Sequence, residues 1–269
     1  MPEIAMAEAP GLGLDGLPRP SEDVVVVLPE AVILLDGATS MRPDLPSGGA
    51  YANELAAQLA GRLTTAPELD LADLLAGAIR SVARGNGFTP GESPASTVAI
   101  VRWNAAEVEA LVLADSPVVA FRPEPEVVAD LRLRNVPRGS YRDRLRGGGG
   151  YSTEHLAALR ASARKTSALR NQEGGYWVAE AVPAAAYHGI RASWPRESVS
   201  AVLMASDGVS CGVDDYGLFG WPEALALATS EGPRAVLEAV RAAERSDPDG
   251  ARWPRPKPYD DQALALITF

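Results

Sequence analysis

Acidic residues stand at the ends of several apolar runs, where carboxylates from distant parts of the chain could act together. Asp36 ends "AVILLD", Asp115 ends "EVEALVLAD" and Asp207 ends "SVSAVLMASD", while the pairs Glu22-Asp23 and Asp260-Asp261 precede two further runs. If these runs are neighbouring strands, the acids gather at one rim of the sheets. Clustered carboxylates raise one another's pKa values unless cations lie between them. The pattern therefore predicts an oxygen-rich site for Mg²⁺ or Mn²⁺.

Other catalytic chemistries have less support in the sequence. The two histidines, His155 and His188, are not close to these acids, and Cys211 is the single cysteine. A zinc site of nitrogen and sulfur ligands is therefore not expected. Ser96 and Thr97 lack both a G-x-S-x-G elbow and a nearby histidine. We interpret them as hydrogen-bonded strand residues and not as nucleophiles.

Strands and amphipathic helices must position these acids, and their order along the chain indicates the fold class. β-rich runs predict a pair of strands over 23–28 and 31–36, an antiparallel meander within 96–122, and later strands within 198–208 and 262–269. Apolar residues at helical spacing predict helices over 48–63, 69–85 and, as a pair, 221–247. Strands grouped with strands and helices grouped in pairs favour an α+β sandwich over βαβ winding.

The composition is that of a soluble globular chain with a strong negative charge. It has 269 residues, 46% of them hydrophobic, and a formal net charge of -10. This charge disfavours nucleic acid and anionic membranes as partners. A single cysteine suits a reducing cytoplasm, which is the location we expect. Nothing in the sequence indicates an oligomeric state.

The first twenty residues differ from the rest, and we expect them to form a mobile leader before a single domain over 20–269. They lack the basic and apolar regions of a signal peptide. Gly11, Gly13 and Gly16 spell G-x-G-x-x-G, but no strand is predicted before them and prolines follow. A dinucleotide site is therefore not expected there.

Residues 132–170 invert the charge of this acidic chain. The segment holds ten basic residues against Asp143 and Glu154, and its "RGGGGYS" stretch disfavours a stable helix or strand. We expect a mobile flap over 137–152 followed by a basic helix. Two readings stay open: a solvated helix face with a linker, or a flap that borders the site and attracts phosphorylated, acidic substrates.

Six short motifs occur in order across the chain. They are Glu22-Asp23, Asp36-Gly37, Ala95-Ser96-Thr97, Ala114-Asp115-Ser116, Ser206-Asp207-Gly208 and Asp260-Asp261. This order resembles the metal-dependent protein phosphatase family, the type-2C serine/threonine phosphatases, whose motifs are an acid pair, D-G, G-S-T, G-D-S, S-D-G and D-N. The resemblance spans residues 20–269 and implies a four-layer αββα sandwich of two antiparallel sheets flanked by helix pairs.

The resemblance also implies a set of metal ligands and the ions that they hold. Asp36 would bridge two Mg²⁺ or Mn²⁺ ions, with the Gly37 carbonyl on one of them. Asp207 and Asp260 would complete the first site, which makes Asp36, Asp207 and Asp260 the catalytic residues. Asp115 matches the aspartate that holds a third ion together with Asp207.

Further roles follow from the resemblance, and the sequence also departs from it. Glu22 and Asp23 would orient metal-bound waters, and Arg19 would bind the phosphate, although it lies three residues before Glu22 where the family has a spacing of four. The family commonly has D-G-H-G-G or D-G-M-G-G, whereas this chain has "DGATS", so Thr39 or a water must replace the histidine as proton donor. Asp261 stands where the family has asparagine, and we favour Asp260 as the ligand by register.

Three functions remain open at this stage. The first is metal-dependent hydrolysis of phosphoserine and phosphothreonine in proteins by a metal-activated water. The second keeps this chemistry but acts on a small phosphorylated metabolite. The third is a pseudophosphatase that binds phosphoproteins without turnover, for which the missing histidine is the main argument.

Overall fold

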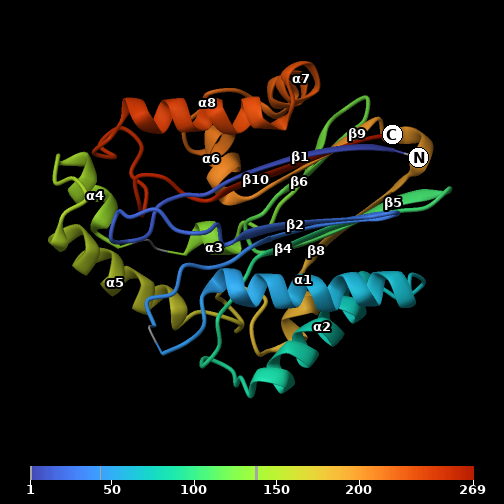
Figure 1. Ribbon diagram of the computed structural model, residues 1–269, viewed down its shortest axis with the longest axis horizontal. Coiled ribbons are helices and arrows are strands. Elements are labelled where there is room, and N and C mark those ends of the chain that lie inside the picture. The colour runs from blue at the N-terminus through green and yellow to red at the C-terminus, as the bar shows by residue number, and fades with distance from the viewer. Residues whose placement is uncertain (1, 43, 137–138) are drawn as a thin grey trace.

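The computed structural model describes residues 2–42, 44–136 and 139–269. At its centre lie two five-stranded sheets whose neighbouring strands are all antiparallel (Figure 1). The first sheet has the order β1 (Glu3–Ala9), β10 (Gln262–Thr268), β9 (Ala201–Ala205), β6 (Val118–Phe121) and β7 (Glu126–Val128). The second sheet has the order β2 (Asp23–Leu28), β3 (Ala31–Asp36), β4 (Val98–Trp103), β5 (Glu107–Leu113) and β8 (Ile190–Pro195).

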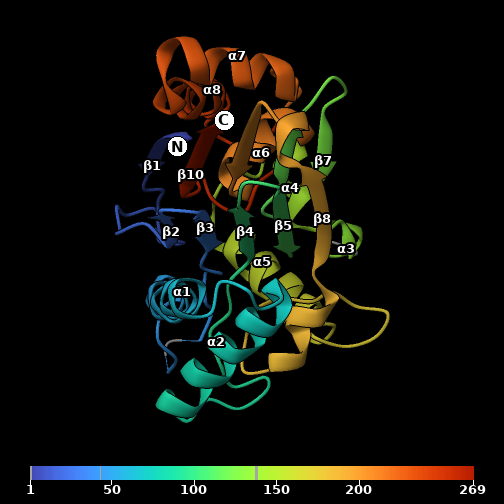
Figure 2. The same ribbon diagram turned by 90° about the vertical axis from the view of Figure 1, so that its right-hand side faces the viewer.

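Helices cover the outer face of each sheet, so four layers are stacked (Figures 1 and 2). The second sheet is covered by α1 (Gly48–Thr65) and α2 (Leu71–Asn86), and the first by α6 (Asp207–Asp214), α7 (Trp221–Glu231) and α8 (Pro233–Ser246). The end of the molecule that lies away from the chain termini carries α3 (Arg132–Asn135), α4 (Tyr141–Arg146) and α5 (Thr153–Ser167) (Figure 1). Two short 3₁₀ helices span Pro183–His188 and Arg196–Ser198.

Strand β3 shows why the sheets are buried between the helix layers. Val32 and Leu34 join the core between the two sheets, whereas Ile33 and Leu35 join the core beneath α1 and α2. Successive side chains of a strand point to opposite faces, so a strand buried on both faces is apolar throughout. The run that leads to Asp36 is therefore an interior strand whose last residue reaches the rim of the sheet.

The predicted α+β fold with two antiparallel sheets and flanking helix pairs is confirmed. The predicted meander is wrong in one respect, because β6 does not pair with β5. After β5 the chain crosses to the other sheet, where β6 pairs with β9 and β7. The crossing takes place at residues 114–117, so this turn carries Asp115 between the sheets.

Two expectations about mobile segments need correction. Residues 3–9 of the expected leader form β1, which pairs with β10 over seven residues, and a strand therefore does precede the glycines at 11, 13 and 16. No helix follows these glycines, so the dinucleotide motif still lacks its structural context. Residues 141–146 of the expected flap form α4, and α5 is the predicted basic helix. Residues 137 and 138 of the flap lie outside the described residues, and its mobility stays a prediction.

Candidate functional site

Acids from both sheets meet in one cavity at the end of the molecule near α5. Asp36, Asp115, Asp207 and Asp260 all line this cavity, which has a volume of about 300 Å³. They come from the end of β3, the crossing after β5, the start of α6 and the residues before β10. The structure thus brings together four acids that are up to 224 residues apart in the sequence. Their roles as ligands stay a prediction.

The backbone of Asp36 is held by the Ser96-Thr97 pair. The Asp36 N–H donates to Thr97 Oγ1 at 3.1 Å, and the Asp36 carbonyl accepts from Ser96 Oγ at 3.0 Å and from the Thr97 N–H at 2.9 Å. Thr97 Oγ1 also lies 2.6 Å from Ser116 Oγ, beside Asp115. These hydroxyls are engaged in positioning two acids, which agrees with the prediction that Ser96 and Thr97 are not nucleophiles.

Glycine is required where the Asp36 turn meets the start of α1. A Cβ on Gly37 would overlap the backbone of Gly48, and a Cβ on Gly49 would press against Glu22. The helix can therefore begin directly against the turn, and the Gly49 N–H points to Glu22 Oε1 at 3.4 Å. This close approach holds Glu22 and Asp36 on neighbouring strands at one rim.

On the side of the other sheet, Asp207 is also positioned by close packing of a glycine. It is the first residue of α6, after the N-cap Ser206. Ser206 Oγ accepts from the Ala263 N–H at 2.9 Å, which ties this turn to the start of β10. A Cβ on Gly208 would overlap the carbonyl of Asp261. The small residue therefore lets the loop before β10, with Asp260, lie against Asp207.

The turn that presents Asp115 is unusual because Ala114 stands where the family motif has glycine. Ala114 has φ 68°, in the left-handed region that costs about 1–2 kcal/mol for residues other than glycine. The Ala114 N–H donates to Asp130 Oδ2 at 3.3 Å, and Asp130 is buried. Asp130 in turn accepts from the guanidinium of Arg132. Buried Asp130, paired with the partly exposed Arg132, holds the turn that carries Asp115.

Burial and neighbouring negative charges raise the pKa values of three of the acids. Burial, followed by the charges of Asp23 and Asp207, raises the pKa of Asp36 well above its usual range. Burial and then the charges of Asp260 and Asp115 do the same to the pKa of Asp207. Burial, with the charges of Asp260 and Asp261, raises the pKa of Asp23 to about 8. Negative charge here is costly unless protons or cations offset it.

The chemistry of this donor set fits a hard divalent cation. All the clustered donors are oxygens, and both carboxylate oxygens of Asp23, which opposes Asp36 in the β2–β3 pair, are buried without a hydrogen bond of ordinary geometry. Such orphaned buried oxygens need a proton or a cation. Among the residues that the structure describes, however, no group of three or more acids, histidines or cysteines forms a ready cage for an ion.

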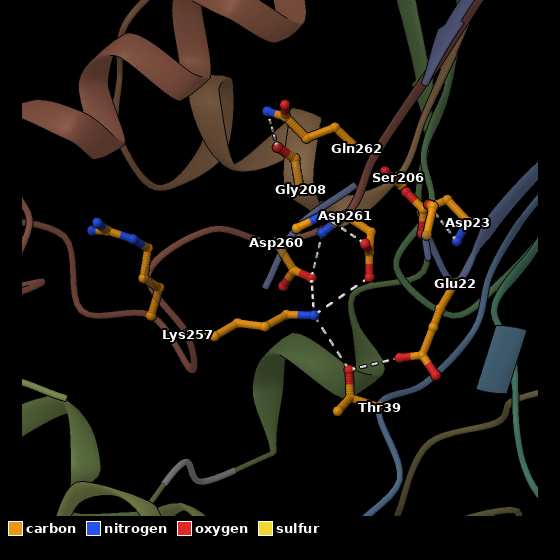
Figure 3. A network of polar contacts seen from close by, with 12 residues as sticks. Glu22, Asp23, Thr39, Ser206, Gly208, Lys257, Asp260, Asp261 and Gln262 are labelled. Carbon is orange, nitrogen blue, oxygen red and sulfur yellow. Dashed lines mark hydrogen bonds and ion pairs between the residues drawn. The ribbon is translucent and has the colours of Figure 1, made fainter. Parts of the chain in front are cut away.

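Two basic side chains lie among the acids. Lys257 Nζ is 2.8 Å from Asp260 Oδ1, 3.5 Å from Asp261 Oδ2 and 3.4 Å from Thr39 Oγ1 (Figure 3). The predicted phosphate ligand, Arg19, pairs with Glu22 and lies 2.5 Å from Asp261 Oδ2. Its guanidinium is thus at the site, although it contacts carboxylates there.

The two neighbouring aspartates before β10 have different surroundings. Asp261 Oδ1 accepts from the Gly11 N–H at 2.8 Å, and Asp261 Oδ2 is taken up by Arg19. Asp260 faces the cavity, and its charge raises the pKa of both Asp36 and Asp207. These differences support Asp260 as the ligand, as the register of the motif predicts.

The basic helix α5 forms a wall of the site. Leu159, Ala163 and Thr166 line the cavity that contains the acids. Arg160 and Arg164, one helical turn apart, line an adjoining cavity of about 560 Å³. Among the described residues these two arginines make no ion pair, whereas other arginines near them do. Unpaired cations next to the acids are available for an anionic partner.

Some positioning residues had no clear signal in the sequence. The Gly11 N–H donates a buried hydrogen bond to Asp261, which is 250 residues away in the sequence. Asp130 accepts a buried hydrogen bond from the Ala114 N–H, in the turn that carries Asp115. The pair Gly48-Gly49 at the start of a predicted helix could have indicated close packing there, because glycine disfavours helices and is retained where another segment comes too close for a side chain. The position of Lys257, three residues before Asp260, indicates that it lies near the site, but in this proline-rich loop no periodic pattern indicates which way its side chain points.

Comparisons with known proteins agree with the fold. The sequence matches no model of a known protein family and no curated protein. Among solved structures, the PPM Ser-Thr phosphatase MsPP from Mycobacterium smegmatis is 17% identical with a TM-score of 0.56, over 99% of this chain and 98% of that one. Stp1 from Staphylococcus aureus is 11% identical with a TM-score of 0.57, over 100% and 95%. The catalytic domain of PstP, solved with two manganese ions, is 15% identical with a TM-score of 0.56, over 99% and 97%. Over nearly its whole length, the chain therefore has the fold of the PPM serine/threonine phosphatases.

Proposed function

We propose that this protein is a metal-dependent phosphatase that hydrolyses phosphoserine and phosphothreonine esters in proteins. The observation that carries the proposal is the convergence of Asp36, Asp115, Asp207 and Asp260 in one cavity of a fold shared with serine/threonine phosphatases. The manganese ions in PstP support a divalent ion of this class. Mg²⁺ and Mn²⁺ both suit carboxylate ligands, and we propose two ions with a third at Asp115.

The acids of the cavity would hold the metal ions. Asp36, the Gly37 carbonyl, Asp207 and Asp260 would hold two ions, and Asp115 with Asp207 a third. When bound, these ions would lower the pKa of an attacking water and offset the phosphoryl charge.

The remaining polar groups would act on waters and on the phosphate. Glu22 and Asp23 would accept hydrogen bonds from waters and so orient them. Arg19 would turn a guanidinium edge to the phosphoryl oxygens. Ala38, at the position of the family histidine, has no proton to give. We therefore assign protonation of the leaving oxygen to a water held near Thr39, which lines the cavity.

Location and partners are part of the proposal. In the part of the chain that the structure describes, no helix is both long and apolar enough to cross a membrane. The acidic charge disfavours nucleic acid and anionic membranes as partners, and the single cysteine supports a cytoplasmic location. The fold shared with serine/threonine phosphatases supports phosphorylated proteins as partners.

A metal-dependent assay tests the proposed chemistry. The protein with Mn²⁺ should hydrolyse p-nitrophenyl phosphate, and Asp36→Asn or Asp207→Asn should lower kcat/KM by about 100-fold or more, because each removes a carboxylate that would hold the ions that activate water and offset the phosphoryl charge. Asp73→Asn, on the exposed side of α2, is the matched control and should keep full activity. Full activity of the Asp36 and Asp207 variants would refute the assignment.

Substrate panels then separate the open alternatives. Phosphopeptides should be turned over with a higher kcat/KM than small phosphorylated metabolites. The reverse order would favour a metabolite phosphatase. Phosphopeptide binding without any turnover in Mn²⁺ would identify a pseudophosphatase.

A further inference from the structure

Lys257 places a buried ammonium group inside the acidic cluster. It lies in the loop between α8 and β10, between Pro256 and Pro258, and its side chain is only 4% exposed. Prolines on both sides restrict the backbone of this segment. In Figure 3 the Lys257 side chain extends from the loop into the centre of the cluster, and its nitrogen lies among Asp260, Asp261 and Thr39.

The contacts of the Lys257 ammonium resemble those that a bound metal ion would make. Nζ is 2.8 Å from Asp260 Oδ1 and 3.5 Å from Asp261 Oδ2, with Thr39 Oγ1 at 3.4 Å. All three partners are oxygens. A buried ammonium is retained only where such partners compensate its lost hydration.

Among the described residues of this cluster, two basic side chains form ion pairs within a group of seven acids. The basic groups are Lys257 and Arg19, and the acids are Glu22, Asp23, Asp36, Asp115, Asp207, Asp260 and Asp261. The acids near Lys257 differ from those farther away. Asp260 and Asp261 each pair with the Lys257 ammonium, whereas the Asp23 carboxylate oxygens make no hydrogen bond of ordinary geometry. Lys257 therefore serves the part of the cluster around Asp260.

We propose that Lys257 is a resident cation that takes the place of a divalent ion at Asp260 and must withdraw from this carboxylate before the ion binds. The inference rests on the proposed function, since Asp260 is there a metal ligand. The free energy of breaking the Lys257–Asp260 pair is then subtracted from the free energy of metal binding. The apparent metal affinity is weaker than the number of carboxylates would provide.

Metal binding to the Lys257→Met variant tests this inference directly. Methionine has a similar length and no charge, so it removes the competitor and keeps the packing. Titration with Mn²⁺, followed by the electron paramagnetic resonance signal of the free ion, should show at least about tenfold tighter binding at the weakest site. Lys257→Arg keeps the charge and should not bind more tightly than wild type. Lys165→Met, on the exposed side of α5, controls for the change in net charge.

Thermal unfolding gives a second readout. In EDTA the Lys257→Met variant should unfold at a lower temperature than wild type, because Asp260 loses its counter-charge and Asp261 keeps only Arg19. Saturating Mn²⁺ should raise its unfolding temperature by more than it raises that of wild type. A variant that is unfolded in EDTA should fold when Mn²⁺ is added, and failure to do so would overturn the inference.

The outcomes also separate this inference from the proposed function. Unchanged or weaker Mn²⁺ binding by Lys257→Met overturns the resident-cation role, even where wild type hydrolyses p-nitrophenyl phosphate. Tighter Mn²⁺ binding without any phosphatase activity in either protein would support the role and refute the proposed function.

Discussion

Asp23 shows how a single buried carboxyl makes the metal-free protein sensitive to pH. Its pKa rises to about 8 through burial and the charges of Asp260 and Asp261, against an ordinary value of 3.8. The folded state thus keeps a proton that the unfolded state has already released. Stability from this proton is complete below about pH 4 and is lost as the pH rises to about 8.

The consequence can be measured at the same residue. In EDTA, the unfolding temperature should fall between pH 5 and pH 8, and Asp23→Asn should make this fall smaller because asparagine has no proton to lose. Asp73→Asn should retain the wild-type profile, since Asp73 is exposed. Scanning calorimetry across the pH range checks both, and an unchanged profile for Asp23→Asn would contradict the role assigned to its burial.

At the level of elements, α5 provides positive charge beside the cavity that contains the acids. Arg160 and Arg164 line the cavity beside the acids and have no carboxylate partner among the described residues. Replacing both with glutamate should raise KM for an acidic phosphopeptide by about tenfold, because two attractive charges become repulsive. The kcat for p-nitrophenyl phosphate, a small substrate, should change by less than about twofold.

A matched control for α5 is available on the same helix. Lys165→Glu reverses a charge on a residue that does not line this cavity. It should leave KM for the phosphopeptide near its wild-type value. If this variant raises KM as much as the double arginine variant, the effect comes from net charge and not from the α5 wall.

The elements that could be predicted from sequence are those with a continuous local pattern. Apart from Asp23 and Asp36, β2 and β3 are apolar, and α1 and α2 have apolar residues at helical spacing, so their bounds follow closely from the sequence. β1 has acids and a methionine within "EIAMAEA", and its partner lies more than 250 residues away in β10. Pairing over such a distance leaves no local pattern.

The same distinction holds for the candidate site. The acids could be predicted because each follows or precedes a strand, and strand ends meet at a rim. The change of sheet after β5 could not, because the turn at 114–117 has the composition of an ordinary hairpin loop. Nor could the direction of Lys257, which depends on how a proline-rich loop folds back over Asp260.

For the whole molecule, the first and last strands are joined along one edge of a sheet. β1 pairs with β10 from Glu3 opposite Thr268 to Ala9 opposite Gln262, and the Gly11 N–H then reaches Asp261. The N-terminal segment therefore supports both the sheet and the loop that carries Asp260. Removal of β1 should weaken the fold and the site together.

A deletion of residues 1–9 tests this dependence. The variant loses the whole β1–β10 ladder, and we expect the free energy of unfolding to fall by about 3 kcal/mol or more, given about 0.5–1.5 kcal/mol for each net hydrogen bond. Denaturant titration measures the change. Deletion of residues 1–2 alone keeps β1 and should have little effect. Equal stability of the longer deletion and wild type would show that β1 does not stabilise the fold.

The pairing of β1 with β10 has a practical consequence. It sets residues 3 and 268 opposite each other, at the end of the molecule away from α4 and α5 (Figure 1). Affinity tags or fusion partners at either terminus would therefore extend from the side remote from the cavity that contains the acids. A short peptide bridge between these ends would also permit circular permutants, with new termini opened in an exposed loop, without disturbing access to the candidate site.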